Sequence, residues 1–388
     1  MNPKPLSGIR VLDLTRLLPG PMATLHLADM GADITKIEDT AAGDYARSLW
    51  SPVDDSSRFF RMLNRNKRAL KLDLKRPTGV EVFFRLARDA DVVVESFRPG
   101  VVDKLGIGYE KVAAINPRIV YCSISGYGQT GPYAHRAGHD INYVGYAGVL
   151  DQIGQAGGPP AIPNYQIADL LGGALVPLVG ILVSLIDARK SGRGRYVDVS
   201  MTDGVFAHAI FPLLGLLLQG RTPPRGADVL TGGVPCYGVY PTADERYLAV
   251  GALEEKFWST LCDTVGRPDL KPHRLARGEN GEFARRELSA VFRAHTLAHW
   301  TKVFAEVDCC VTPVLTIEES RQDPQLRARG MAIEVDGLPQ FAPPFQLSDF
   351  ELGTPRPAPQ PGADSETVLR EAGYTIDEIA ALRAQAII

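Results

Sequence analysis

The first two hundred residues alternate short apolar runs with amphipathic segments. Apolar runs typical of strands occupy 9–14, 32–38, 69–74, 91–95, 118–125 and 196–200. Amphipathic or strongly apolar helices are predicted between them, at 21–30, 78–89 and 170–186. Strands separated by helices indicate βαβ units, and the right-handed crossover rule then predicts an open, parallel, Rossmann-like sheet. The turn after the first strand has no G-x-G-x-x-G, so a dinucleotide site is not predicted.

The second half of the chain has a different pattern. A very apolar helix is predicted over 203–219, and the Gly-, Pro- and Arg-rich stretch that follows it is typical of a linker. A smaller unit is predicted next, with strands at 246–252 and 310–315 and helices at 255–265, 282–294 and 297–307. Residues 338–362 are rich in proline and predict an irregular strap, and 365–386 predict one or two short helices. The 388 residues exceed one ordinary core, so two domains are expected.

Composition narrows the class of protein. Hydrophobic residues make up 45% and the formal net charge is −3, which favours a globular protein and gives no basic field for nucleic acid. The five cysteines are odd in number and form no CxxC, which argues against a disulfide framework or a zinc site and favours a reducing, cytoplasmic location. The uncharged run 170–186 contains glycines and a proline, so a helix buried in an α/β domain is favoured over a membrane span.

One candidate for chemistry is His139 in the segment 138–143. This segment follows the strand ending at Ser125 and the Gly-rich loop 126–132. Open α/β sheets place their sites in loops that leave the carboxyl ends of parallel strands. Histidine is the side chain best suited to proton transfer near neutral pH. The alternative is an ordinary loop histidine without a role in chemistry.

Two carboxylates are further candidates. Asp169 begins the apolar helix, where it is either an N-cap or a partly desolvated group that serves as acid, base or nucleophile. Glu254 follows the strand at 246–252, where it is either an ordinary acid at a helix start or part of a site. Basic residues at 64–68 and at Lys75, Arg98 and Lys104 are either solvated surface or phosphate ligands.

Several blocks of this sequence resemble the class III CoA-transferase superfamily of CaiB/BaiF type. These blocks span nearly the whole chain and comprise 5–11, 19–21, 31–33, 72–75, 98–101, 126–132 and 310–315. Within the superfamily, the segments 137–143, 233–235 and 250–254 look most like the alpha-methylacyl-CoA racemase branch. The chain departs from that branch at Glu255-Lys256, at Lys104, and at Asp39, where an arginine often contacts CoA; Lys36 is a candidate to compensate.

The resemblance implies an α/β fold in an interlocked homodimer. It implies a large Rossmann-like domain from both chain ends, 1–220 and 326–388, and a small α+β domain at 221–325. Each active site would lie where the large domain of one subunit meets the small domain of the other. It implies a CoA site formed by Leu72, Asp73, Lys75, Phe97, Arg98, Lys104, Gly138, Asp140 and Tyr143. No metal, no cofactor beyond the CoA of the substrate, and no nucleic acid or membrane partner are expected.

The reaction implied is inversion at C2 of a 2-methyl-branched acyl-CoA. A base removes the α-proton on one face and an acid returns a proton on the other. His139 and Asp169 are the expected pair, with Glu254 orienting His139. The alternative is transfer of CoA to a free carboxylic acid with Asp169 as nucleophile. Asp169 serves both reactions, whereas His139 is required only for inversion.

Overall fold

The computed structural model describes residues 4–50, 57–350 and 355–388. Contacts divide the chain into two compact units, which are described separately. The larger unit contains 1–147, 164–208 and 329–388, and the smaller contains 148–163 and 209–328. This division assigns 148–163 and 209–220 to the smaller unit, although both were expected in the large domain. The predicted limits of independent domains stay predictions.

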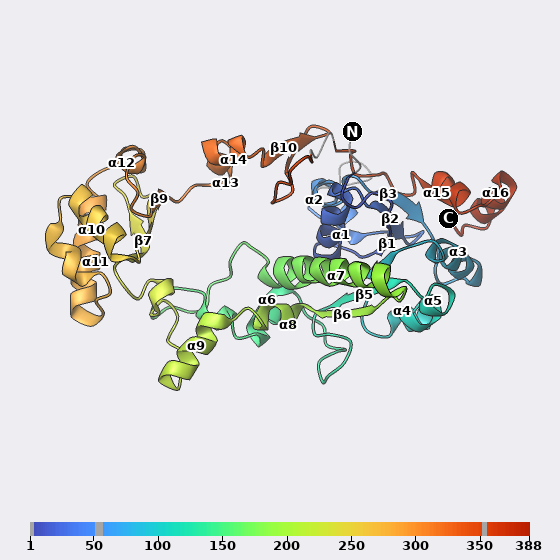
Figure 1. The fold of residues 1–388 in the computed structure, drawn as a ribbon, viewed down its shortest axis with the longest axis horizontal. Helices are drawn as coiled ribbons and strands as arrows, with labels where there is room; N and C mark the ends of the chain where they lie inside the picture. The colour runs from blue at the N-terminus through green and yellow to red at the C-terminus, as the bar shows by residue number, and fades with distance from the viewer. Residues whose placement is uncertain (1–3, 51–56, 351–354) are drawn as a thin grey trace. The chain divides into compact units, whose positions relative to one another are not determined.

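The larger unit is built on one sheet of six parallel strands (Figure 1). The strands are β1 (Arg10–Leu14), β2 (Asp33–Glu38), β3 (Arg68–Lys71), β4 (Val92–Glu95), β5 (Val120–Ser125) and β6 (Tyr196–Ser200). Their order is β3-β2-β1-β4-β5-β6. The first three strands are added toward one edge of the sheet and the next three toward the other, so the order of addition reverses between β1 and β4. The predicted Rossmann-like parallel sheet is therefore confirmed, and ligands of such sheets bind beside the carboxyl ends at this reversal.

Helices cover both faces of the sheet. On one face, α1 (Pro19–Asp29) contacts β2, and α7 (Val176–Ser191) contacts β5, β6 and α1. On the other, a continuous apolar core joins alternate strand residues to α3 (Pro77–Ala87), α5 (Tyr109–Ile115), α15 (Ser365–Glu371) and α16 (Ile376–Ala384). Shorter elements of this unit are η1 (Tyr45–Arg47), α2 (Arg58–Leu63), α4 (Val101–Leu105), α6 (Asp140–Tyr146), the π-helix η3 (Ala168–Leu175) and α8 (Met201–Phe206).

Both ends of the chain contribute to this unit. The Asp364 N–H donates to the carbonyl of Ala69 at 3.0 Å, and the Asp364 carboxylate accepts from the Ala69 N–H at 2.8 Å. The Asp73 N–H donates to the carbonyl of Ile387. Val368 and Ile387 are fully buried in the core formed with α3. The expected return of the C-terminal segment to the sheet is therefore confirmed.

Two predicted elements are wrong in detail. The single helix expected over 203–219 is broken into α8 and α9 (Ile210–Gln219), because Pro212 has no N–H and its ring would clash with the His208 carbonyl of a continuous helix. The strap expected to be irregular begins with the strand β11 (Leu338–Phe341), which forms a hairpin with β10 (Ala332–Val335) just before the strap. Its turn is Asp336-Gly337, and both residues have positive φ, as a type I′ turn requires. Residues 351–354 of the strap lie outside the described residues.

The smaller unit has a three-stranded antiparallel sheet in the order β7-β8-β9. Its strands are β7 (Tyr237–Pro241), which was not predicted, β8 (Tyr247–Gly251) and β9 (Val311–Pro313). Its main helices are α10 (Glu255–Thr264), α11 (Gly278–Phe292) and α12 (Leu297–Phe304), which bury Trp258, Phe292 and Trp300 against the strands. Its short elements are η2 (Leu150–Gln152), η4 (Val229–Thr231), η5 (Pro268–His273), α13 (Ile317–Ser320) and α14 (Pro324–Ala328).

The continuous helical segment Ala168–Ser191 is long and apolar enough to cross a membrane by length and composition, a test that core helices also pass. One face of α7 is buried against the sheet through residues such as Ile181 and Leu185. The opposite face exposes Leu175, Val179, Val183 and Ile186, which are three or four residues apart and so align along one side. The helix therefore has a packed side and an uncovered apolar side.

Candidate active site

Asp169 lies in the first turn of the π-helix η3. Segments of π-helix are rare and frequently occur at functional sites. Glycines let this helix approach its neighbours closely: a Cβ on Gly172 would lie 2.4 Å from the Met201 carbonyl oxygen, and one on Gly173 would lie 2.5 Å from the Pro19 Cβ. The position of Asp169 is therefore fixed by tight packing of η3 against α1 and α8.

The Asp140 carboxylate connects the His139 segment to the start of η3. One of its oxygens accepts hydrogen bonds from the N–H groups of Ala168, at 2.7 Å, and Asp169, at 3.0 Å. These are donors at the start of η3, which Asp140 caps from 28 residues away. The residue that follows His139 in the chain is thereby bonded to the backbone of Asp169.

The environment of Asp169 favours its protonated form. Burial is the main cause, and the negative charge of Asp140 adds to it, so that the pKa of Asp169 rises to about 7. Within the described ranges, no lysine or arginine forms an ion pair with either carboxylate. A carboxyl group with this pKa can both donate and accept a proton near neutral pH.

His139 is exposed and immediately precedes α6. Its backbone is extended, and its N–H donates to Asn142 Oδ1 at 3.0 Å. Because this bond fixes the backbone while the side chain stays open to solvent, the imidazole is accessible to a substrate.

Tyr143 fills the space behind this segment. Its hydroxyl donates to the Gly138 carbonyl at 2.6 Å, and its ring excludes a Cβ at both Gly126 and Gly138. Burial, followed by the charge of Asp169, raises the pKa of Tyr143 to about 12, while Arg98 opposes this rise. Tyr143 therefore lies close enough to both Asp169 and Arg98 for their charges to act on its hydroxyl. Gly138, expected in the CoA site, is required here for packing.

A cluster of aromatic side chains beside Tyr143 was missed by the sequence analysis. The Tyr127 ring contacts the rings of Tyr133, Tyr143 and Tyr146 at centroid distances of 6.0, 5.2 and 5.7 Å. Arg136 lies over Tyr133 and donates to the Tyr146 hydroxyl at 2.9 Å. Tyrosines at 127, 133, 143 and 146 within one Gly-rich loop and the following helix were the available signal.

The other residues expected in the CoA site follow β3 and β4. Leu72 is fully buried in the core, so only its backbone can reach a ligand, whereas Lys75 is exposed. Phe97 and the exposed Arg98 follow β4, and the exposed Lys104 lies on α4. Strands β3 and β4 are separated by β2 and β1, so the ends of these two strands lie about 14 Å apart across the sheet. The Asp73 carboxylate accepts from the Lys75 N–H and so orders the turn after β3.

Lys36 does not compensate for Asp39, contrary to expectation. Its side chain is fully buried and binds Asp44, at 2.8 Å, and the Thr15 carbonyl, also at 2.8 Å. The cation beside Asp39 is Arg16, at 3.0 Å, which the sequence analysis did not single out. Its position directly after the first strand was the only signal for it.

Glu254 lies in the smaller unit, directly before α10, and its side chain is exposed. Its charge contributes to a raised pKa of Cys310, after burial and the charge of Asp308. The β7-β8-β9 sheet of this unit lines a hollow of about 900 Å³, to which Tyr237, Gly251 and Cys310 contribute. Glu254 thus follows the strand whose last residue, Gly251, lines this hollow.

Several known proteins resemble this chain in sequence and in fold. The alpha-methylacyl-CoA racemase of Homo sapiens is 37% identical over 99% of this chain and 97% of its own length. The acetyl-CoA:oxalate CoA-transferase of Acetobacter aceti is 33% identical over 91% of this chain and 92% of its own length. The crystal structure of a CaiB/BaiF family protein from Brucella suis superposes with a TM-score of 0.82, at 31% identity, over 95% of this chain and 99% of that one. The family model for CoA-transferase family III matches residues 6–365, and this chain therefore belongs to that family.

Proposed function

We propose that this protein inverts the configuration at C2 of a 2-methyl-branched acyl-CoA thioester. The observation that carries the proposal is the pair of hydrogen bonds that the Asp140 carboxylate accepts from the Ala168 and Asp169 N–H groups, because Asp140 is the neighbour of His139 in the chain. Inversion needs two groups that exchange roles as acid and base. An exposed histidine and a carboxyl group with a pKa of about 7 can each take either role near neutral pH.

In the proposed reaction, His139 removes the C2 proton and leaves an enolate, and protonated Asp169 returns a proton to the opposite face. In the reverse direction, Asp169 removes the proton and the imidazolium of His139 returns it. Glu254 is proposed to orient His139. Arg98, Lys75 and Lys104 supply positive charge for the phosphates of CoA, and Phe97 and Tyr143 supply apolar contacts.

The second candidate is transfer of CoA between an acyl-CoA and a free acid, and the similarity to an acetyl-CoA:oxalate CoA-transferase supports it. In that reaction the Asp169 carboxylate attacks the thioester carbonyl and CoA thiolate leaves, giving a mixed anhydride. His139 has no required role there. The raised pKa of Asp169 favours inversion, because a nucleophilic carboxylate must be ionised and a proton donor must not be.

The deciding experiment is incubation of the protein with a single enantiomer of a 2-methyl-branched acyl-CoA in heavy water, without any carboxylic acid. Inversion predicts deuterium at C2 together with loss of optical purity. The His139→Ala variant should lose both. Full exchange by His139→Ala would overturn the proposal, and acylated Asp169 trapped by hydroxylamine, without exchange at C2, would establish transfer instead.

We also propose that the protein acts as a homodimer. In the larger unit, the exposed face of α7 is apolar, and in the smaller unit α9 exposes Ile210, Phe211, Leu213, Leu214, Leu217 and Leu218. Large exposed apolar faces are rare on monomers and indicate an interface. Light scattering on the purified chain should give about twice the mass of 42.1 kDa, and a monomer at micromolar concentration would contradict this assignment.

A further inference from the structure

Arg16 occupies the place in the sheet where ligands of Rossmann-like folds bind. It follows β1, and Ser96 and Phe97 follow β4, the two strands between which the sheet order reverses. The Arg16 N–H donates to Ser96 Oγ at 3.2 Å, so the two loops are joined across this reversal. Crevices at such a reversal are the general ligand sites of open α/β sheets.

The guanidinium of Arg16 is held in a defined position. Its Nη2 donates to Asp39 at 3.0 Å, and its Cζ lies 5.2 Å from the Phe97 ring centroid and 5.3 Å from that of Tyr45. The side chain is 25% exposed and that of Asp39 is 30% exposed, so one edge of the pair reaches solvent. A salt bridge exposed to this degree contributes little to stability, which argues against a purely structural role.

Asp39 is itself fixed by the backbone. Its Oδ1 accepts from the N–H groups of Ala41 and Gly43, which leaves Oδ2 for Arg16. Burial opposes ionisation of Asp39, but the Gly43 hydrogen bond and the charge of Arg16 outweigh burial and hold the pKa below its ordinary value. Asp39 therefore stays charged and orients the guanidinium.

Hydrogen bonds to two carboxylates, Asp44 and Glu95, also fix the two loops beside Arg16. Leu17 has a φ of 64°, a left-handed conformation that is costly for leucine, and its N–H donates to Asp44 at 3.0 Å. The Phe97 N–H donates to the buried Glu95 carboxylate at 2.7 Å. Such a backbone conformation persists only where surrounding contacts enforce it, and here it sets the direction of the chain next to Arg16.

A guanidinium has five N–H donors, and Asp39 occupies only one nitrogen of Arg16. Nη1 lies 3.5 Å from the Tyr45 hydroxyl, and Nε makes no hydrogen bond among the described residues. We propose that Arg16 binds a phosphate of the CoA nucleotide, and that Asp39 is the positioning residue that aims it. This assignment rests on the proposed CoA site and deepens it.

The test compares Arg16→Ala with the full-length wild type by calorimetric titration of CoA, dephospho-CoA and pantetheine. We expect Arg16→Ala to weaken CoA binding about tenfold to a hundredfold, the effect of losing hydrogen bonds to a charged group, and to leave pantetheine binding unchanged. Equal weakening for dephospho-CoA assigns the contact to the pyrophosphate, and no weakening assigns it to the 3′-phosphate. Arg16→Lys should retain part of the affinity, because the charge remains.

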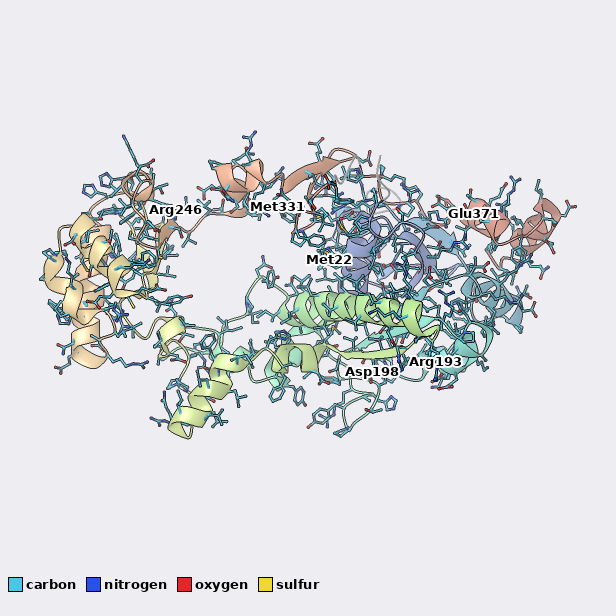
Figure 2. All side chains as sticks on the ribbon, viewed as in Figure 1. Met22, Arg193, Asp198, Arg246, Met331 and Glu371 are labelled. Atoms are coloured by element: carbon cyan, nitrogen blue, oxygen red, sulfur yellow. The ribbon has the colours of Figure 1, made fainter. Side chains whose placement is uncertain are left out.

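The matched control is Arg68→Ala at the opposite edge of the same sheet. Arg68 forms ion pairs with Asp33 on β2 and with Glu371 on α15, which is labelled in Figure 2. The Arg68→Ala variant should bind CoA with a dissociation constant within about twofold of the wild-type value. If Arg16→Ala binds CoA as tightly as the wild type does, the assignment of Arg16 is overturned and the proposed function is not. A wild type that binds no CoA overturns both this assignment and the proposed function.

Discussion

Two groups of charged residues in the larger unit differ in burial and in the presence of cations. Beside β1 and β2, Asp13 binds Lys67 at 3.2 Å, and the Lys67 ammonium also donates to Thr24 and Asn64. Burial alone would raise the pKa of Asp13, but Lys67 and Lys36 outweigh burial and hold it below the ordinary value. At the start of η3, Asp140 and Asp169 lie together without such a cation, and the pKa of Asp169 rises to about 7.

The two groups show that carboxylates beside the same sheet can have different roles, one in stability and one in chemistry. A buried carboxylate surrounded by lysines stays ionised and fixed, so it serves the fold. A half-buried carboxylate beside another carboxylate changes its protonation state near neutral pH, so it is available to a substrate. The first group connects β1 to the segment before β3, whereas the second lies beyond β5 and beside an exposed histidine.

The largest effect is expected from Asp169→Asn. The substitution removes the only group proposed to exchange a proton on its face of the substrate, so deuterium incorporation at C2 should fall by about a hundredfold to ten-thousandfold. The melting temperature should not fall, because the fold loses a carboxylate whose charged form is disfavoured there. Mass spectrometry and calorimetry measure the two quantities. If the variant still incorporates deuterium at C2, or if its melting temperature falls by several degrees, Asp169 does not differ from Asp13 in the way argued above.

Lys67→Met should have the opposite effect to Asp169→Asn: it should lower the stability of the fold. It leaves Asp13 buried with fewer partners, so the free energy of unfolding should fall by about 3–5 kcal/mol. Urea denaturation measures this loss, and the double variant with Asp13→Asn should recover part of it, since the uncompensated charge is then removed. A loss below about 1 kcal/mol would show that the lysine cluster does not stabilise the fold.

Glu95 combines features of both groups, since it is buried like Asp13 and, in the part of the chain that the structure describes, forms no ion pair, like Asp169. Burial raises its pKa to about 7, although hydrogen bonds from Ser123 and the Phe97 N–H oppose this rise. Asp198, labelled on β6 in Figure 2, adds negative charge. Because the folded state holds this proton more tightly than the unfolded state does, the contribution to stability is complete at pH values below about 4.5 and is lost as the pH rises through about 7.

Glu95→Gln should therefore remove part of the decline in stability between these pH values, by as much as about 3 kcal/mol at pH 8. Urea denaturation of both proteins at pH 5 and pH 8 gives the difference. Identical pH dependence in the variant and the wild type would mean that Glu95 titrates as an ordinary exposed carboxylate.

The smallest effect is expected from Asp140→Asn. The amide oxygen can still accept from the Ala168 and Asp169 N–H groups, but the negative charge beside Asp169 is lost. The pKa of Asp169 should then move down toward its ordinary value. In the reaction direction in which Asp169 donates the proton, the decline of kcat/KM at high pH should shift to lower pH. A shift to higher pH would show that Asp140 does not act on Asp169 through its charge.

Apolar periodicity was sufficient to predict the six strands of the larger sheet and its helices α1, α3 and α7, because each pattern has one stable way to bury its face. The short helix α5 was not predicted. The predicted helix 203–219 was wrong at Pro212, a backbone effect that overrides a continuous apolar pattern. The hairpin at Asp336-Gly337 was missed because its two strands are only four residues long, although the turn dipeptide itself was a signal.

The sequence by itself determined the alternating α/β architecture, the family, and the candidate chemistry of His139 and Asp169, since these depend on residue type and local period. Only the tertiary structure decided that Asp140 joins these two residues, that Lys36 is buried, and that Arg16 lies beside Asp39. The physical reason is that hydrogen bonds and charges act over a few ångströms in space, between residues that are 23 to 29 positions apart in the chain.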